Sequence, residues 1–272
     1  MTAITTYDLP RETPSAGWLV AAGQIYRRWA VNNVREAWGI GVGLLQPVVW
    51  ILLFGQVFKS VGSIPGFGSG SYITFLAPGI LMMTVLYSGV WAGTSYIEDI
   101  DNGVMNQTLT APISRSAVVA GQLGVQLTLG LVQSGLVLVI GYLGGARYPG
   151  GVTGVLLALA AATLLAIIFC AGSVAIALTT RSQIALIGLS QMIILPATFL
   201  SSGMMAPNLM PGWVQTISKY NPVSWAVDIG RSALAGNTDW PFTSEHLGYL
   251  AALAALSFWW AVSAFRGYQR TQ

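Results

Sequence analysis

The sequence predicts an all-α polytopic membrane protein with six transmembrane helices, an amphipathic N-terminal helix at the membrane surface, and short re-entrant or interfacial helices before the last span. Composition is the first reason. Charged residues make up 8% of the 272 residues, whereas 54% are hydrophobic and 32 more are glycine; soluble domains carry about 25% charged residues. The second reason is that apolar runs long enough to cross a bilayer recur along the chain. A soluble enzyme and a disordered chain are therefore excluded.

The segment 1–38 precedes the first apolar run and is expected to be cytoplasmic and to contain the surface helix. Apolar residues recur there at helical spacing and share one face: Trp18, Ala22, Ile25 and Trp29. Three arginines lie off this face: Arg27, Arg28 and Arg35. This pattern is typical of a helix that lies in the membrane interface, with its basic side toward lipid phosphates. A simple anchor that orients the first span explains it equally well.

The segment 39–272 is expected to be one transmembrane domain. About 20 apolar residues, at about 1.5 Å per residue, cross a hydrocarbon core of about 30 Å. Six runs reach that length: 39–58, 73–96, 117–143, 152–178, 184–204 and 247–265. Since none of these runs contains Asp, Glu, His or Arg in its interior, an ion-coupled carrier is disfavoured.

The basic residues indicate the orientation. Of the 12 Lys and Arg, eight fall on the side that holds both termini and four on the other side. The positive-inside rule therefore places both termini, the polar insert 98–115 and the turn at Arg181 in the cytoplasm. With this arrangement we expect a multi-pass protein of the plasma membrane.

The stretch between the fifth run and the last one is irregular. Residues 205–245 are apolar and aromatic but contain Pro211, Pro222 and Pro241. Irregular backbone at membrane depth has to be buried in protein or line a cavity. We therefore expect short re-entrant or interfacial helices here, with Asp228 and Arg231 paired at spacing i, i+3 in a structural role.

Small and polar residues inside the spans indicate helix contacts. Gln122, Gln126 and Gln133 share one face of the third span, where they either bond across helices or line the path of an amphiphilic substrate. Several glycine pairs at four-residue spacing favour close helix packing or a dimer seam: Gly39 and Gly43, Gly89 and Gly93, and Gly141 and Gly145.

Enzymatic sites are not indicated. Neither Lys59 nor Lys219 lies in a Walker A loop, so ATP hydrolysis is expected in a separate chain. Cys170 and His246 are the sole residues of their types, which disfavours a metal site and an intramembrane hydrolase. The scattered basic residues do not form a nucleic-acid-binding stripe. We therefore predict no catalytic residue, no bound metal and no cofactor in this chain.

Two motifs and the overall layout resemble the membrane subunits of type 2 ABC exporters, the group that includes daunorubicin-resistance permeases. The first motif is the insert 98–115, which carries Glu98, Gly103, Gln107, Leu109, Pro112, Ser114 and Arg115. The second is Pro211-Gly-Trp followed by Asn221-Pro-Val-Ser-Trp-Ala-Val-Asp-Ile-Gly-Arg231 before the last span. The layout combines a surface helix, six spans and a long connection between the fifth and sixth.

This resemblance implies a permease that pairs with a second permease, identical or different, and with a cytoplasmic subunit that binds ATP and Mg²⁺. It implies that the insert is a coupling helix, with contacts from Glu98, Asp99, Gly103, Leu109, Pro112, Ser114 and Arg115. It also marks the motif before the last span, with Asn221, Pro222, Asp228 and Arg231. In one departure, Asp99, Asp101 and Asn102 follow Glu98 where the family commonly has basic residues, which indicates either a more basic groove in the partner or a coupling contact shifted toward Ser114 and Arg115.

The resulting hypothesis is an ATP-driven exporter permease for an amphiphilic or apolar substrate, such as a drug or lipid. Export of a polysaccharide or glycoconjugate is an alternative within the same family. A motor-independent carrier or an assembly factor for membrane proteins is a second alternative. The sequence does not distinguish the substrates, nor a homodimer from a heterodimer.

Overall fold

The computed structural model of the chain describes residues 17–35, 37–57, 72–105, 114–205 and 207–270, and these ranges contain helices and no strand. The all-α prediction is confirmed. The α-helices are α1 (Trp18–Arg35), α2 (Ala37–Val57), α3 (Tyr72–Asp101), α5 (Arg115–Leu143), α6 (Gly151–Thr180), α7 (Gln183–Phe199), α8 (Gly212–Ser218), α9 (Pro222–Leu234) and α10 (Trp240–Arg270), with the 3₁₀ helix η2 (Pro207–Leu209) before α8.

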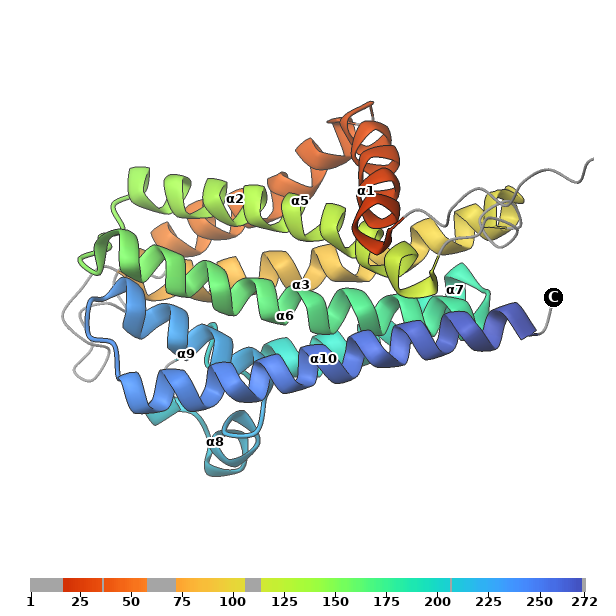
Figure 1. Cartoon of the computed structure of the whole chain (residues 1–272). Helices are drawn as coiled ribbons and strands as arrows, with labels where there is room; N and C mark the ends of the chain where they lie inside the picture. Colours follow the sequence, from red (N-terminus) through yellow and green to blue (C-terminus); the bar gives the residue numbers. More distant parts are fainter. Residues whose placement is uncertain (1–16, 36, 58–71, 106–113, 206, 271–272) are drawn as a thin grey trace, which may run out of the picture.

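The helices form an elongated bundle with α6 at its centre. Figure 1 shows α3, α5, α6 and α10 side by side along the long axis, and α6 contacts α3, α5, α7, α9 and α10. Within the described residues, α3, α5, α6 and α10 are long and apolar enough to cross a membrane. The helix α7 and the part 47–57 of α2 are shorter apolar helices. The chain is thus a multi-pass membrane protein.

Two exposed tryptophans lie far apart along α10. Trp240 and Trp259 are 59% and 67% exposed. Since a helix rises about 1.5 Å per residue, they lie about 28 Å apart, close to the hydrocarbon thickness of about 30 Å. Tryptophan favours the interface on either side of a membrane, so this spacing fits a helix long enough to cross one.

The helix ends differ from the predicted spans in two ways. The helices α3 and α10 are longer than the runs 73–96 and 247–265, because polar residues outside the hydrocarbon continue the same backbone hydrogen bonding. The acidic residues Glu98 and Asp99 therefore lie in the last turn of α3. By contrast, α7 ends at Phe199 and does not continue to residue 204, because the backbone leaves the helical conformation at Leu200.

The central packing contact is the crossing of α3 and α6. Gly89 lies against Phe169 and Cys170, and Gly93 lies against Ser173. The Ser173 hydroxyl donates to the Val90 carbonyl at 2.7 Å and accepts from the Gly93 amide at 3.1 Å. This glycine pair therefore serves packing inside the chain, as the absence of side chains lets two backbones approach closely.

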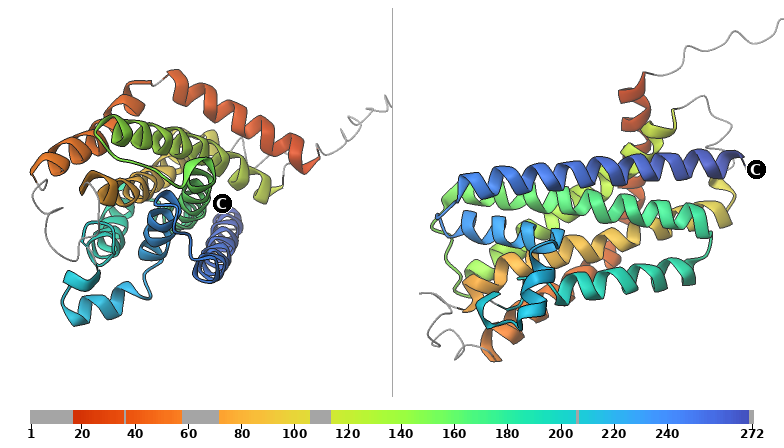
Figure 2. Two further views of the ribbon diagram at one scale, coloured as in Figure 1. Left: turned by 90° about the vertical axis from the view of Figure 1, so that its left-hand side faces the viewer. Right: turned by 90° about the horizontal axis from the view of Figure 1, so that it is seen from below.

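The short helices before α10 occupy different environments. The helix α8 lies across the bundle axis at its periphery, whereas α9 runs along the axis against α3, α6 and α10 (Figure 2). A Cβ at Gly150 or Gly154 of the α6 start would collide with the Ala233 carbonyl of α9. Close backbone contact thus fixes α9 to the centre of the bundle.

We expect Gly93→Val to lower the free energy of unfolding by about 1–3 kcal/mol more than Gly172→Val does, because only the first inserts atoms into a filled helix crossing. Gly172 is the matched control, since it is also helical but has open space at its Cβ position. Thermal or SDS-induced unfolding in detergent measures the difference. Equal losses in the two variants would show that the crossing is not tightly packed.

Candidate functional site

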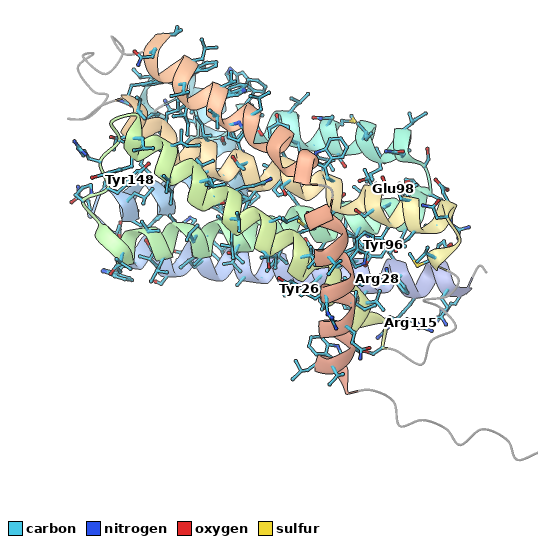
Figure 3. All side chains as sticks on the ribbon, turned by 90° about the horizontal axis from the view of Figure 1, so that it is seen from above. Tyr26, Arg28, Tyr96, Glu98, Arg115 and Tyr148 are labelled. Atoms are coloured by element: carbon cyan, nitrogen blue, oxygen red, sulfur yellow. The ribbon has the colours of Figure 1, made fainter. Side chains whose placement is uncertain are left out.

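One end of the bundle gathers the termini of several helices and is called the α1 end. Figure 3 shows Arg28 of α1, Glu98 at the end of α3 and Arg115 at the start of α5 together there, with Tyr148 at the other end. The ends of α6 and α10 reach the same region (Figure 1). The described arginines at this end are Arg27, Arg28, Arg115, Arg181, Arg266 and Arg270. The insert 98–115 thus begins and ends at an end of the bundle where several arginines lie.

The helix α1 lies across the bundle and packs on α5. Ala21 and Ile25 are buried, and Gly121 of α5 faces Ala22 and Ile25. Trp18 is 46% exposed, and Trp29 is half-buried. The apolar face predicted from the sequence therefore divides between a contact with protein at Ile25 and a surface that stays open near Trp18.

Two side chains of α1 contact residues near the two ends of the insert. Arg28 Nη2 donates to Asp99 Oδ2 of α3 at 3.1 Å. Trp18 Nε1 donates to Ser116 Oγ of α5 at 3.0 Å. The helix α1 is therefore bound near both ends of the insert, at its second residue and directly after its last residue.

The start of the insert is a helix end with an unfavourable charge distribution. The last turn of α3 carries Glu98, Asp99 and Asp101, at the end of the helix where the macrodipole is negative. Arg28 offsets part of this repulsion, while Glu98 is exposed. Gly103 follows with φ of +72°, a left-handed conformation that glycine adopts without strain and that ends helices. Leu109 and Pro112 lie outside the described residues.

The end of the insert contacts α10. Ser114 is exposed and extended, and it precedes α5 as its cap without a side-chain hydrogen bond. Arg115 Nε donates to Gln269 Oε1 at 2.8 Å, and the Arg181 guanidinium lies 4.7 Å from the centre of the Tyr268 ring. Through these contacts the last turn of α10 is bound to the start of α5 and to the α6–α7 turn.

The three glutamines of α5 are buried in the chain. Gln122 is 2% exposed, and Gln126 and Gln133 are each 9% exposed. Gln122 Nε2 lies 3.4 Å from the Ala92 carbonyl of α3 and donates to it. For Gln122, this hydrogen bond is the interhelical contact that was one of the two roles predicted from the sequence.

A second polar site lies where α7 ends. Here Ser202 is fully buried and lies outside the helices. Side chains of α9 form hydrogen bonds with its amide, hydroxyl and carbonyl groups. Its amide donates to Ser224 Oγ at 3.3 Å, its hydroxyl donates to Asp228 Oδ1 at 2.6 Å, and its carbonyl accepts from Arg231 Nη2 at 2.7 Å. We call these four residues the Ser202 clamp.

The clamp gives a physical reason for the motif before the last span. Asn221, Ser224, Asp228 and Arg231 recur at three- and four-residue spacing and so share one face of α9. Asn221 caps α9 by accepting from the Val223 amide, with Pro222 at the first position, and its Nδ2 donates to the Ala197 carbonyl of α7 at 2.7 Å. The motif thus supplies hydrogen bonds to backbone groups at the end of α7 and directly after it.

The predicted pairing of Asp228 with Arg231 is confirmed, at 3.2 Å. The guanidinium also lies 3.9 Å from the centre of the Phe75 ring of α3. Sequence reasoning missed Ser202 and Ser224. The helical spacing of polar residues along 221–231 was a signal for Ser224, whereas no local pattern distinguishes Ser202.

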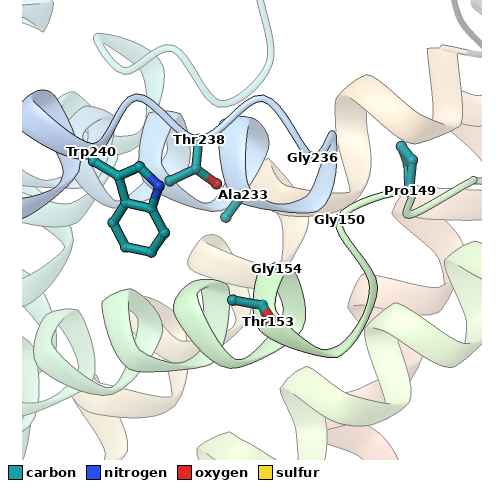
Figure 4. Close-up of a pocket in the computed structure, with 8 residues that line it drawn as sticks. All are labelled: Pro149, Gly150, Thr153, Gly154, Ala233, Gly236, Thr238 and Trp240. Atoms are coloured by element: carbon teal, nitrogen blue, oxygen red, sulfur yellow. The ribbon is translucent and has the colours of Figure 1, made fainter.

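A pocket lies at the end of the bundle opposite α1. Its volume is about 340 Å³, and it lies between the first turn of α6 and the α9–α10 turn (Figure 4). Thr153, Thr238 and Trp240 supply its side-chain hydrogen-bonding groups, and no titratable side chain lines it. Within the described residues, no group of three or more His, Cys, Asp or Glu is placed to hold a metal ion.

We expect Arg28→Asp and Asp99→Arg each to loosen α1, and the double reversal to restore it. A partly exposed ion pair contributes about 1 kcal/mol. Some backbone amides of α1 exchange their hydrogen only when α1 leaves the bundle, and these should exchange about fivefold faster in either single variant. Hydrogen exchange in lipid nanodiscs measures this. Arg27→Asp, at an exposed neighbouring arginine, is the control for the charge change alone. If the double reversal stays as loose as the single variants, the pair does not hold α1.

Comparisons with known proteins agree with this architecture. The sequence profile of the ABC-2 type transporter family matches residues 22–235. The chain is 30% identical over 198 residues to the daunorubicin resistance ABC transporter permease protein DrrB1 of Streptomyces coeruleorubidus, an alignment that covers 71% of this chain and 67% of that protein. It is 30% identical over 204 residues to the transport permease ycf38 of Porphyra purpurea, covering 75% and 69%. It is 23% identical over 252 residues to the doxorubicin resistance permease DrrC of Mycobacterium tuberculosis, covering 93% and 88%. The chain therefore belongs to the ABC-2 type transporter family.

Proposed function

We propose that the chain is the permease subunit of an ATP-driven exporter, which moves an amphiphilic or apolar substrate such as a drug or lipid outward. The family membership supports a transport role. Two relatives carry drug-resistance names, for daunorubicin and for doxorubicin. Daunorubicin and doxorubicin are the drugs in the names of those relatives. The substrate class proposed for this chain includes amphiphilic or apolar compounds in general.

We further propose that six helices span the plasma membrane, namely α2, α3, α5, α6, α7 and α10. The α1 end, with its arginines, then faces the cytoplasm, and both termini lie on that side. The opposite end, with α8 and the α9–α10 turn, faces outward. In this orientation α1 lies at the cytoplasmic surface, where Arg27 is exposed to lipid phosphates.

The observation that carries the proposal is the acidic end of α3 beside the insert. Three acidic residues at the negative end of a helix dipole are unfavourable, and Arg28 pairs with only one of them, Asp99. A basic groove on a cytoplasmic partner would relieve the remaining repulsion of Glu98 and Asp101. The partner would hold ATP and Mg²⁺, and its closure on ATP would push the insert, including Gly103, Leu109, Pro112 and Ser114, toward the membrane.

The contacts of the insert would carry this push into the membrane domain. Asp99 and Ser116 would pass it to α1, and Arg115 would pass it to the end of α10. A second permease copy, identical or different, would complete the transport path. The exposed apolar surface of α7, with Ile184 87% and Met192 76% exposed, is suited to contact with lipid or with that copy.

Two alternative functions are transport of a different substrate and a role that needs no ATP-binding partner. A polysaccharide or glycoconjugate substrate fits the exposed aromatic residues at the opposite end, Trp213, Tyr220 and Trp240, because such rings stack on sugars and also favour the membrane interface. A motor-independent carrier or assembly factor would need no partner at the insert. The variant below distinguishes the motor-driven exporter from this last class.

We expect Arg115→Glu to abolish export and the ATP turnover that the permease stimulates in its partner, while membrane insertion is retained. The change removes the hydrogen bond to Gln269 and adds a fourth acidic residue near the insert. Arg270→Glu makes the same charge change at an exposed position of the same end and should retain most of both activities. ATP turnover in membranes, with the amount of inserted protein measured beside it, is the readout.

Normal export and ATP turnover in Arg115→Glu would contradict the coupling role. Equal loss in Arg115→Glu and Arg270→Glu would show a general effect of charge and not a specific contact at the end of the insert.

A further inference from the structure

The pocket between the α6 start and the α9–α10 turn has a closely packed backbone around it. Gly150 and Gly154 of α6 line it where they meet the Ala233 carbonyl, and a Cβ at either glycine would collide with that carbonyl. The Gly150 amide donates to the Leu234 carbonyl at 3.0 Å. Gly236 follows α9 with φ of +74°, a conformation that glycine adopts without strain. The pocket is therefore held in shape by the bundle itself, as is usual for binding sites.

Three side chains supply the polar and aromatic groups of this pocket. Figure 4 shows Trp240 and Thr238 on the α9–α10 side of the pocket and Thr153 on its α6 side. None of these side chains is hydrogen-bonded to another residue that the structure describes. The two hydroxyls and the indole N–H are therefore available to a ligand. The Trp240 side chain is 59% exposed, so its ring is also open to contact.

The pocket offers no counter-charge to an ionic ligand, because no titratable side chain lines it. The charged residues next to its lining in sequence make other contacts. Asp239 Oδ1 accepts from the Phe242 amide at 3.3 Å. The Arg147 guanidinium lies 5.5 Å from the centre of the Tyr142 ring. Since a charge that leaves water without a partner is unfavourable, the pocket favours a neutral ligand.

A neutral ligand has to match both the indole ring and the two hydroxyls. A purely apolar molecule would cover the hydroxyls of Thr153 and Thr238 without bonding them, which is unfavourable. A sugar ring has apolar C–H groups on its face, which suit contact with an indole, and hydroxyls at its edge, which donate and accept hydrogen bonds. The pocket volume of about 340 Å³ is near the lower limit of about 300 Å³ for ligand pockets, so it suits a small ring better than a long chain.

We propose that this pocket binds a neutral sugar ring, with the Trp240 indole against the face of the ring and the hydroxyls of Thr153 and Thr238 bonded to its edge. In the orientation proposed above, the pocket opens at the outer surface of the membrane. The sugar is therefore either the headgroup of a glycolipid or part of a molecule in the water outside. This inference goes beyond the proposed function, because binding requires neither a partner subunit nor ATP.

The test observes Trp240 directly. The full chain is labelled with 5-fluorotryptophan and placed in phosphatidylcholine nanodiscs, which contain no sugar, and the ¹⁹F signal of Trp240 is assigned by its loss in Trp240→Phe. The methyl glycosides of glucose, galactose, mannose and N-acetylglucosamine are then added separately. We expect a saturable shift of the Trp240 signal with at least one of them. The signals of Trp213 and Trp259, which are also exposed, should not change.

Variants of the pocket show whether the sugar binds there. Thr153→Phe places a ring in the pocket and should abolish the shift. Val152→Phe is the matched control, because it makes a similar change at a neighbour that is 77% exposed and does not line the pocket, and it should retain the shift. Thr153→Ala should weaken binding about three- to tenfold through the lost hydrogen bond, and Thr153→Ser should restore it. A shift that persists in Thr153→Phe would place the sugar elsewhere and overturn the proposal.

A second arm separates the two sources of the sugar. Nanodiscs that contain a glucosyl diacylglycerol, without soluble glycoside, present the ring on a lipid. A shift of the Trp240 signal in these discs supports the site and assigns it to a glycolipid, whereas a shift with soluble glycosides alone supports the site and assigns it to a molecule in the water outside. No saturable shift in either arm would overturn the proposal and leave the proposed exporter standing. Tighter binding of glucosamine or glucose 6-phosphate than of the neutral glycosides would overturn the assignment of a neutral ligand.

Discussion

A chain at membrane depth has to satisfy each backbone N–H and C=O inside the protein, because the hydrocarbon offers no partner. Continuous helices meet this constraint by themselves, and α3, α5, α6 and α10 do so over most of the bundle. This constraint matters where α7 ends, because the backbone beyond Phe199 is not helical. There the side chains of α9 take over the role of the next helical turn, and Ser202 is bonded at its amide, hydroxyl and carbonyl. The polar residues of the motif 221–231 are thus required by the interrupted helix, while close backbone packing on α6 holds α9 in place.

The two ends of the bundle are built differently. At the α1 end, charged and amide side chains connect elements far apart in sequence: Arg28 with Asp99, Trp18 with Ser116, and Arg115 with Gln269. Along the middle, small residues bring backbones together, as at Gly93 and Ser173. At the far end, α9 is packed closely on α6, and the segment after α7 is both bonded to α9 and packed on α3 where Gly203 meets Gly79.

Much of this architecture follows from local properties of the sequence. The apolar runs predicted the helices, because a helix is the one structure that can cross a membrane as a single segment, and the prolines of 205–245 predicted the interruption. The helix ends were less predictable, since Glu98 continues α3 past the apolar run 73–96 and Trp240 begins α10 before the run 247–265. The contact of Arg28 with Asp99 joins residues separated by most of two helices, so it depends on how α1 lies on α5. Ser202 carries no signal of its own, because its role arises from the residues that α9 brings to it.

The claim on which the functional account depends is that a separate ATP-binding subunit docks at the insert 98–115. The most direct measurement is purification of the tagged chain from its native membrane in mild detergent, followed by quantitative mass spectrometry of the proteins that accompany it. The account predicts a soluble subunit with a Walker A loop in equal ratio to the permease. Recovery of the chain without such a subunit, under conditions in which other membrane complexes stay intact, would contradict it.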